Sequence, residues 1–441
     1  MKQEEILVLD FGSQYNQLIA RRIRDLGVFS ELVSYDIDIK KEMEEKNIKG
    51  IILSGGPNSV YEEGSFKVSK DIYDLGIPVL GICYGMQLTS YLNGGEVSPC
   101  SKKEYGGKEI DADNTSVIFE GTPAKQMVWM SHGDQVTKLP AGFRSIASTP
   151  ECPNAAMAND ERRIYGLQFH PEVNNSVFGK QLLGNFIFKV CGCGATWSME
   201  KYVDEQIASI RATVGDKKVL LGISGGVDST VAAVLINRAI GEQLTCMFID
   251  HGLLRKNEGD EVENIFGPNG SFDINFIRVN AQERYYGKLA GVEEPERKRK
   301  IIGEEFIRVF EEEAKKIGAV DFLAQGTIYP DVVESGLGGE SAVIKSHHNV
   351  GGLPDFVDFK DIVEPLRNLF KDEVRKAGLE LGLPPELCRK APSDGMCGKT
   401  DEDKYGFTYD ELEKVARGKE AEVDAEKAKL IKSKLRFMSF K

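Results

Sequence analysis

Short apolar runs alternate with amphipathic stretches in the first part of the chain. The runs occupy residues 6–10, 50–54 and 77–82. The segment 14–26, after the first run, has the spacing of a helix. Strands rich in Val, Ile and Leu that are separated by helices are typical of a parallel sheet covered on both faces. The stretch 190–195, rich in Gly and Cys, predicts the end of this first domain.

A second alternation of the same kind follows a helical segment at residues 197–214. Apolar strands are predicted at 217–223 and 244–250. A helix at 304–317 then precedes another apolar run at 320–325. This order predicts a second parallel α/β domain.

The character of the chain changes beyond Pro392, where short polar and charged segments lead to a Lys/Glu-rich helical stretch at 419–434. We therefore expect an α/β fold class, with two doubly wound, mainly parallel-sheet domains and a short, mostly helical C-terminal tail. The expected domains are residues 1–195, 196–387 and 388–441.

Composition narrows the class of protein. A chain of 441 residues with 41% hydrophobic residues fits a soluble globular protein of two or three domains. We expect a cytoplasmic protein without a membrane partner, because no run approaches the ~20 apolar residues of a membrane span and the start of the chain has no signal-peptide pattern. The eight scattered cysteines favour reduced thiols, and the net charge of −13 argues against a nucleic-acid partner.

Gly81-Ile-Cys-Tyr-Gly85 has the form of a nucleophile elbow, in which a buried strand turns sharply into a helix. The flanking glycines leave room for the strained backbone of the nucleophile. A helix beginning near Tyr84 would favour the thiolate form of Cys83. A buried structural cysteine is the alternative, but the strand before it and the helix after it favour a nucleophile.

A cysteine nucleophile needs an imidazole to accept its proton and a third group to orient the imidazole. His170 and Glu172, in Phe169-His-Pro-Glu172, supply both. His132, with Asp134 two residues on, is the competing base.

An oxyanion hole is expected from backbone N–H groups near this nucleophile. Ser54-Gly-Gly-Pro57 follows another predicted strand. The N–H groups of Gly56 and Tyr84 would point at the developing negative charge.

A second site is predicted where the strand ending at Ile223 meets a helix. The loop there consists of small residues and one carboxylate: Ser224, Gly225, Gly226, Val227, Asp228 and Ser229. Its backbone would approach a polyphosphate at the helix N-terminus. No Gly-Lys-Ser/Thr follows, so this is not the pattern of a γ-phosphate transferase.

Three further positions are candidates for the ATP site. Ile249 lies at the end of the next strand, where an open α/β sheet recognises adenosine. Lys345, in a Gly-rich segment, would reach a phosphate. Asp228 and Asp331 are the candidate ligands of Mg²⁺, which is typically held by carboxylates and phosphate oxygens.

The segments of the first half resemble the class I glutamine amidotransferases. More narrowly, residues 9–14, 53–60 and 129–135 resemble that domain in the GMP synthetase family. The resemblance covers nearly all of residues 5–195. It implies a triad of Cys83, His170 and Glu172, a γ-glutamyl thioester and the release of glutamate.

The Ser224–Ser229 loop resembles the pyrophosphate loop of the N-type ATP pyrophosphatases, which adenylate an acceptor oxygen. Residues 250–255, 295–303, 345–354 and 364–375 again resemble the GMP synthetase family. The resemblance implies ATP as a substrate with Mg²⁺, and passage of ammonia between the two halves.

After Pro385 the GMP synthetase family continues into a dimerisation domain that helps to bind XMP. Here residues 390–402 and 405–409 resemble the C-terminal segment of NAD synthetases instead.

Three readings of the function follow. The first is a glutamine-dependent amidating ligase of the GMP synthase type, which converts XMP, ATP and glutamine into GMP, AMP, pyrophosphate and glutamate. The second is a related amidotransferase acting on another acceptor such as deamido-NAD. The third is a non-catalytic nucleotide-binding regulatory protein. The oligomeric state stays open.

Overall fold

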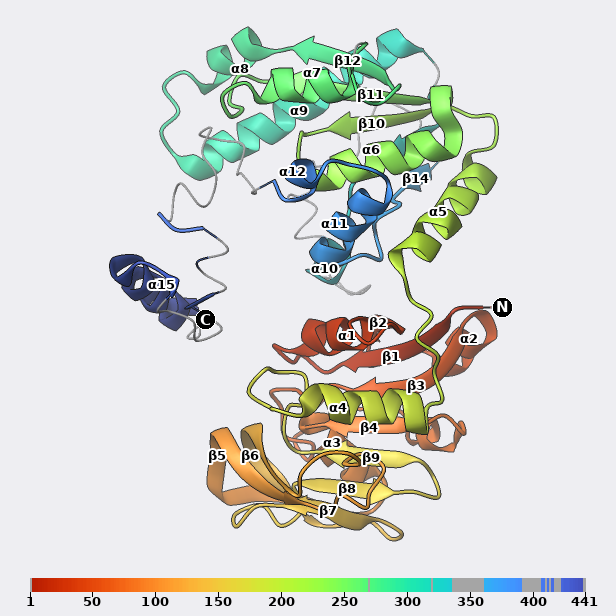
Figure 1. Cartoon of the computed structure of the whole chain (residues 1–441), viewed down its shortest axis with the longest axis vertical. Coiled ribbons are helices and arrows are strands. Elements are labelled where there is room, and N and C mark those ends of the chain that lie inside the picture. Colours follow the sequence, from red (N-terminus) through yellow and green to blue (C-terminus); the bar gives the residue numbers. More distant parts are fainter. Residues whose placement is uncertain are drawn as a thin grey trace. The chain divides into compact units, whose positions relative to one another are not determined.

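A computed structural model describes residues 2–268, 270–318, 320–334, 361–390, 406–408, 411, 414, 415 and 422–438. The chain divides into two compact units between Ser198 and Met199, and each unit is described by itself (Figure 1). Lys345 and residues 391–405 of the predicted tail lie outside the described residues.

The first unit alternates strands and short helices along the chain. Its strands are β1 (Glu4–Asp10), β2 (Phe29–Ser34), β3 (Asn47–Leu53), β4 (Val79–Ile82), β5 (Glu96–Ala112), β6 (Lys125–Lys138), β7 (Arg144–Ser148), β8 (Ala156–Asn159) and β9 (Ile164–Leu167). Its helices are α1 (Asn16–Arg24), α2 (Ile39–Glu45), α3 (Tyr84–Leu92) and α4 (Gly179–Gly184), with a 3₁₀ turn at Lys70–Asp74 and a π turn at Asn185–Val190.

One nine-stranded sheet runs through this unit in the order β2-β1-β3-β4-β9-β8-β7-β5-β6. The parallel arrangement predicted from the sequence is confirmed for β2, β1, β3, β4 and β9. The strands β8, β7, β5 and β6 pair antiparallel instead.

The antiparallel half of the sheet follows from its connections and its side-chain pattern. No helix separates β5 from β9 along the chain, and parallel neighbours need a crossover of a dozen residues or more. Buried and less buried residues alternate along much of β6, as expected for a strand with one face toward water. Figure 1 shows β5 and β6 as a hairpin at one edge of the sheet.

The second unit repeats the alternation with longer helices. Its strands are β10 (Val219–Ile223), β11 (Leu244–Asp250), β12 (Asn275–Asn280), β13 (Phe322–Ala324) and β14 (Asp361–Val363). Its helices are α5 (Met199–Val214), α6 (Val227–Ile240), α7 (Glu258–Phe266), α8 (Gln282–Leu289), α9 (Pro295–Ile317), α10 (Tyr329–Glu334), α11 (Lys371–Glu380), α12 (Pro385–Cys388) and α15 (Ala425–Met438), with a 3₁₀ turn at Gly241–Gln243.

The five strands of this unit form one parallel sheet in the order β12-β11-β10-β13-β14. Residues of α8 and α9, including Tyr285 and Phe310, pack on one face against Leu220 of β10 and Met247 of β11. The helices α5, α6 and α11 pack together, so the predicted doubly wound arrangement is confirmed. The strand order reverses between β10 and β13, which is where open α/β sheets bind ligands.

The described part of the C-terminal stretch has a small apolar cluster of its own. Phe407, Val415, Ala428 and Ile431 are buried together. The helical stretch predicted at 419–434 is confirmed as α15. The separate tail domain at 388–441 stays a prediction.

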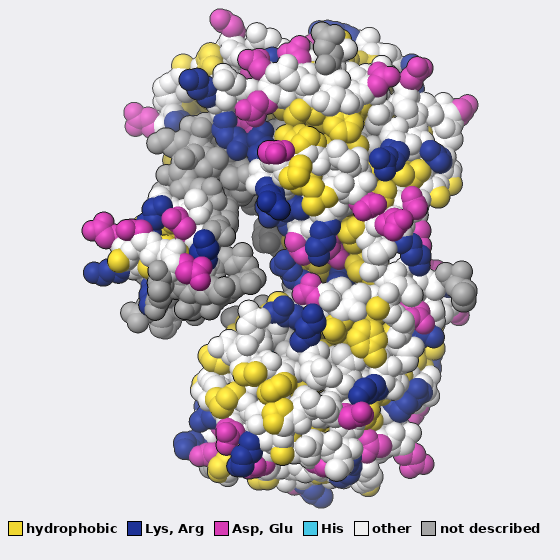
Figure 2. Space-filling view, viewed as in Figure 1, with side chains coloured by type: hydrophobic (Ala, Val, Ile, Leu, Met, Phe, Trp, Pro, Cys, Tyr) yellow, Lys and Arg dark blue, Asp and Glu magenta, His cyan; other side chains and the backbone are white. Residues whose placement is uncertain are grey.

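The surface of both units carries basic and acidic side chains side by side on the face shown in Figure 2. Among the described residues, no helix combines the length and the apolar character that a membrane crossing requires.

Candidate active sites

Cys83 lies at the junction of β4 and α3 in a strained conformation, with φ 52° and ψ −106°. Its N–H donates to the carbonyl oxygen of Leu167 at 2.7 Å, which holds the turn against β9. A Cβ on Gly81 would collide with the backbone of Gly85, and one on Gly85 would collide with the backbone of Leu53. Glycine is therefore required on both sides, as the elbow pattern predicts.

His170 and Glu172 form a buried pair just beyond β9. His170 Nδ1 lies 2.7 Å from Glu172 Oε1, and both residues are at least 95% buried. Burial alone would lower the pKa of His170, but the carboxylate of Glu172 and the side chain of Cys83 raise it well above its usual value. The carboxylate therefore orients the imidazole and favours its protonated form.

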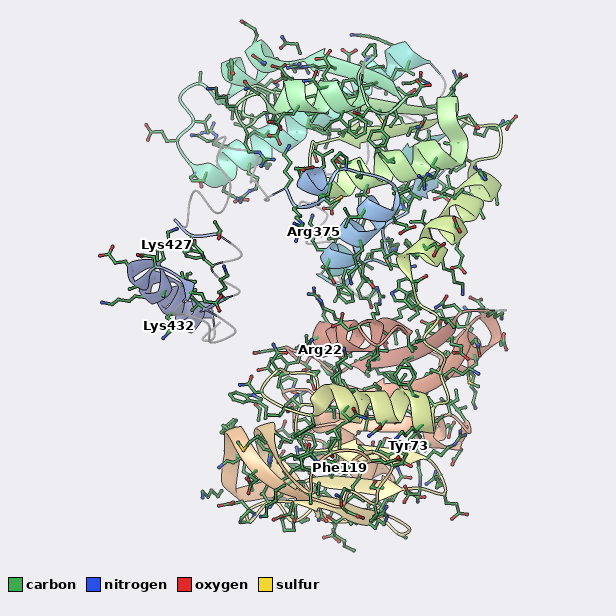
Figure 3. All side chains as sticks on the ribbon, in the orientation of Figure 1. Arg22, Tyr73, Phe119, Arg375, Lys427 and Lys432 are labelled. Carbon is green, nitrogen blue, oxygen red and sulfur yellow. The ribbon has the colours of Figure 1, made fainter. Side chains whose placement is uncertain are left out.

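The segment that carries this pair is tied to its neighbours. The N–H of His170 donates to the carbonyl of Trp129 in β6 at 3.0 Å, and Ser176 Oγ donates to the carbonyl of His170 at 2.6 Å. Arg22 on α1, labelled in Figure 3, donates through Nε to the carbonyl of Glu172 at 3.0 Å. These contacts hold the backbone that positions the imidazole beside Glu172.

Cys83 and His170 line one cavity of about 520 Å³, together with Gly56. A Cβ on Gly55 would lie 3.2 Å from His170 Cε1 and 3.7 Å from Cys83 Cβ, so only a glycine leaves open the space between them. The Cys83 thiol donates to the carbonyl of Ser131 at 3.7 Å. The volume suits a small polar substrate.

His132, the competing base, lines the same cavity but its ring has other partners. Its Nδ1 lies 3.0 Å from the carbonyl oxygen of Asp134, and its Nε2 lies 3.3 Å from Glu104 Oε2. Burial lowers the pKa of His132. The geometry therefore favours His170 as the base.

The Ser224–Ser229 loop of the second unit forms a tight turn between β10 and α6. Gly225 has φ +75°, a value that favours glycine. The N–H groups of Ser224 and Gly226 donate to Ser229 Oγ at 3.2 Å and to Ser224 Oγ at 3.3 Å. The first turn of α6 begins with Val227, so the helix N-terminus faces the loop.

Asp228 has one carboxylate oxygen with a partner and one without. Lys371, the first residue of α11, places Nζ 2.5 Å from Asp228 Oδ2. Asp228 Oδ1 is buried and has no hydrogen-bond partner. An orphaned carboxylate oxygen at a predicted phosphate site fits a cation.

Lys371 is a site residue that the sequence reasoning missed. It lies in the segment 364–375 that resembles the GMP synthetase family, but nothing in the spacing indicates that it meets a loop 143 residues earlier. Gly326, after β13, is the other missed position. A Cβ there would lie 3.1 Å from the backbone nitrogen of Ser229, so the loops after β10 and β13 meet at the reversal of strand order.

Two other predicted positions have structural roles. The Ile249 side chain is buried in the core between the sheet and α9, so a part in ATP binding would fall to its backbone. Asp331 Oδ2 accepts from the N–H of Ile328 at 3.1 Å, in the first turn of α10. Their roles, like that of Lys345, stay predictions.

Comparisons with known proteins match both units. Residues 7–190 match the family model described as glutamine amidotransferase class-I. Residues 198–267 and 344–438 match the NAD synthase model.

Three relatives are called glutamine-hydrolyzing GMP synthase. The Lachnospira eligens protein is 60% identical over 93% of this chain and 79% of its own length. That of Agathobacter rectalis is 64% identical over 90% of this chain and 75% of its own length. A third, from Clostridium botulinum, is 60% identical over 90% of this chain and 77% of its own length.

The fold and the two sites define a glutamine amidotransferase joined to a ligase domain of the ATP pyrophosphatase type. The chain belongs to the glutamine-hydrolyzing GMP synthase family and is a glutamine-hydrolysing carbon–nitrogen ligase.

Proposed function

We propose that the chain makes GMP from XMP, with glutamine as the nitrogen donor and ATP as the activating substrate. The buried Cys83–His170–Glu172 arrangement carries the first half of the proposal. Cys83 Sγ attacks the side-chain amide of glutamine while His170 takes the thiol proton and delivers it to the leaving ammonia. Water then cleaves the γ-glutamyl thioester and releases glutamate.

The N–H groups of Gly56 and Tyr84 stabilise the oxyanion of the tetrahedral intermediate in this proposal. Gly56 borders the cavity of Cys83, and Tyr84 follows Cys83 as the first residue of α3. Glu172 holds the imidazole ring and stabilises its charged form.

The second half of the proposal rests on the Ser224–Ser229 loop. The loop and the N-terminus of α6 bind the β- and γ-phosphates as one pyrophosphate unit. An acceptor oxygen attacks the α-phosphorus and pyrophosphate leaves. Ammonia then displaces AMP from the adenylated acceptor. When Asp228 binds a metal cation instead of Lys371, the ammonium group of Lys371 neutralises charge on the departing pyrophosphate.

Mg²⁺ fits this site through the unpartnered Oδ1 of Asp228, with Asp331 as a second candidate ligand. Bound there, it would draw charge from the phosphate oxygens. The cytoplasm suits the proposed reaction, since Cys83 must stay a reduced thiol and the described cysteines form no disulfides.

A panel of acceptors tests the proposal. The chain is incubated with glutamine, ATP and Mg²⁺ and with XMP, deamido-NAD or no acceptor, while AMP, pyrophosphate and glutamate are measured. GMP, AMP and pyrophosphate in equal amounts are expected with XMP.

Deamido-NAD is in the panel because the NAD synthase match continues to residue 438. Turnover of deamido-NAD without turnover of XMP would show that XMP is not the acceptor. The proposed amidotransferase chemistry would still stand. Products of ADP and phosphate would contradict the adenylation step itself.

A further inference from the structure

Three buried side chains of metal-ligand type meet beside the glutamine cavity, apart from the triad. They are Glu104 on β5, His132 on β6, and Cys152 in the turn between β7 and β8. At most 4% of the surface of each is exposed. Their ligand atoms all lie within 4.8 Å of one another.

The hydrogen bonds of His132 fix its tautomer. The carbonyl oxygen of Asp134, 3.0 Å from Nδ1, can only accept, so Nδ1 carries the proton. A neutral ring then presents the lone pair of Nε2 to Glu104 Oε2 at 3.3 Å. Two acceptors at this distance need a proton or a cation between them.

We propose that Glu104, His132 and Cys152 bind one Zn²⁺ ion through a carboxylate oxygen, Nε2 and the thiolate sulfur. Nitrogen, oxygen and sulfur donors are the set that zinc takes, and tetrahedral ligand atoms lie roughly 3.4 Å apart at the usual bond lengths. The ligand atoms lie within 4.8 Å of one another, so each separation would have to shorten by at most about 1.4 Å to reach that geometry. Water from the cavity that His132 borders supplies the fourth ligand.

The groups behind these ligands match those that orient zinc ligands. The Asp134 carbonyl accepts from His132 Nδ1, and the Thr149 hydroxyl lies 3.1 and 3.3 Å from the two oxygens of Glu104. Cys100 Sγ lies 3.5 Å from Nδ1, on the protonated side of the ring, and is therefore not a ligand.

Zinc would join β5 and β6, which contribute to the wall of the cavity of Cys83, to the turn between β7 and β8. Lys103, Tyr105 and Ser131, which line the cavity, lie within two residues of Glu104 or His132. Loading the ion should therefore raise the melting temperature of the first unit.

The test uses the full chain with Cys83→Ala, so that the catalytic thiol cannot hold the metal. Chelator-treated protein is loaded with Zn²⁺, desalted and assayed for metal, and a second sample is loaded with Co²⁺ for absorption spectroscopy. We expect one Zn²⁺ per chain, a thiolate-to-cobalt charge-transfer band, and a raised melting temperature. Adding Cys152→Ser should abolish all three, and adding Cys191→Ser, the matched control, should leave them.

Glu104→Gln is a second test of the site, which is needed if the Cys152→Ser variant does not fold. It keeps the shape of the side chain and should weaken zinc binding by about tenfold or more. Zinc that stays bound in both variants, or a parent protein without zinc and without the cobalt band, would overturn the site.

Discussion

In the proposed mechanism, the use of glutamine depends on the thiol of Cys83. Cys83→Ala should lower glutamine-dependent amination and glutaminase activity by about 10⁴-fold or more, because no other group can form the thioester. Amination with added ammonium salts should persist, since the Ser224–Ser229 loop lies in the other unit. Parallel assays with glutamine and with ammonium chloride measure the difference.

Cys191→Ala is the matched control for this substitution, as a thiol of the same unit outside the cavity. It should leave both nitrogen sources usable. If a well-folded Cys83→Ala protein lost the ammonia-dependent reaction as well, the two chemistries would not be separable in the way proposed.

Glu5 is a second residue with a measurable signature, this time in stability. Burial and the neighbouring negative charge of Glu31 raise its pKa to about 8 in the folded chain, against 4.5 for the ordinary side chain. The folded state therefore holds a proton that the unfolded state has lost between pH 4.5 and 8. Stability falls as pH rises through this window, by a few kcal/mol at most, and is then constant above it.

Glu5→Gln removes this dependence because an amide cannot ionise. The variant should melt at about the same temperature as the parent near pH 4.5 and several degrees higher at pH 9. Thermal melts across the pH range measure the difference, with the exposed Glu45→Gln as control. Equal melting temperatures of parent and variant at pH 9 would mean that ionisation of Glu5 does not lower the stability of the folded state.

Candidate site residues that lie within a few positions of one another in the sequence were predictable. Those that meet only in the folded chain were not. The elbow at Gly81–Gly85 and the pair His170 and Glu172 are local patterns, and the structure gives them the expected geometry. Lys371 and the Glu104–His132–Cys152 cluster join distant segments. No periodicity or spacing reveals such contacts.

Among the elements, the junction of β10 and α6 is where the proposed mechanism locates the adenylation of the acceptor. Asp228→Asn keeps the volume of the side chain and removes the charge that faces Lys371 and the proposed cation. Conversion of ATP to AMP should fall by about 100-fold or more. Basal glutaminase activity should be unchanged, and the separate assays of AMP and glutamate measure this contrast.

Asp204→Asn, on the exposed side of α5, is the control for charge removal in the same unit. It should retain AMP formation. An Asp228→Asn protein with undiminished AMP formation would remove Asp228 from the site.

The parallel elements were predictable because burial on both faces leaves continuous apolar runs. The strand predicted at 244–250 has the bounds of β11, and the helix predicted at 197–214 begins two residues before α5. The antiparallel strands β5 to β8 were missed. In β6 the half-exposed face dilutes the apolar pattern, and β7 and β8 are short strands of five and four residues.

At the scale of the whole molecule, the C-terminal stretch is attached close to the proposed ATP site. Lys390 Nζ lies 3.0 Å from Glu258 Oε1 and 3.5 Å from Glu261 Oε2, at the first turn of α7. The same Glu258 oxygen would lie 3.5 Å from a Cβ on Gly225 in the pyrophosphate loop. Lys390, near the start of the stretch, is therefore held beside the proposed position of the phosphates.

We expect the chain beyond Lys390 to help position the acceptor, because Lys390 lies close to the loop that is proposed to bind ATP. A protein that ends at Lys390 keeps Cys388, which is buried against α11. It should retain glutaminase activity and lose amination by about 100-fold or more, since misplacing a reactant by an ångström can cost that much.

Lys390→Gln in the full-length chain should show a smaller loss of amination, because only the ion pairs of Lys390 are removed. Initial rates of AMP formation and glutamate release with saturating XMP, and again with deamido-NAD, measure both half-reactions, after circular dichroism has confirmed that each variant is folded. Full amination by the shortened chain would mean that the acceptor is held by residues before 390 alone, and a change of preferred acceptor would place the specificity in the stretch itself.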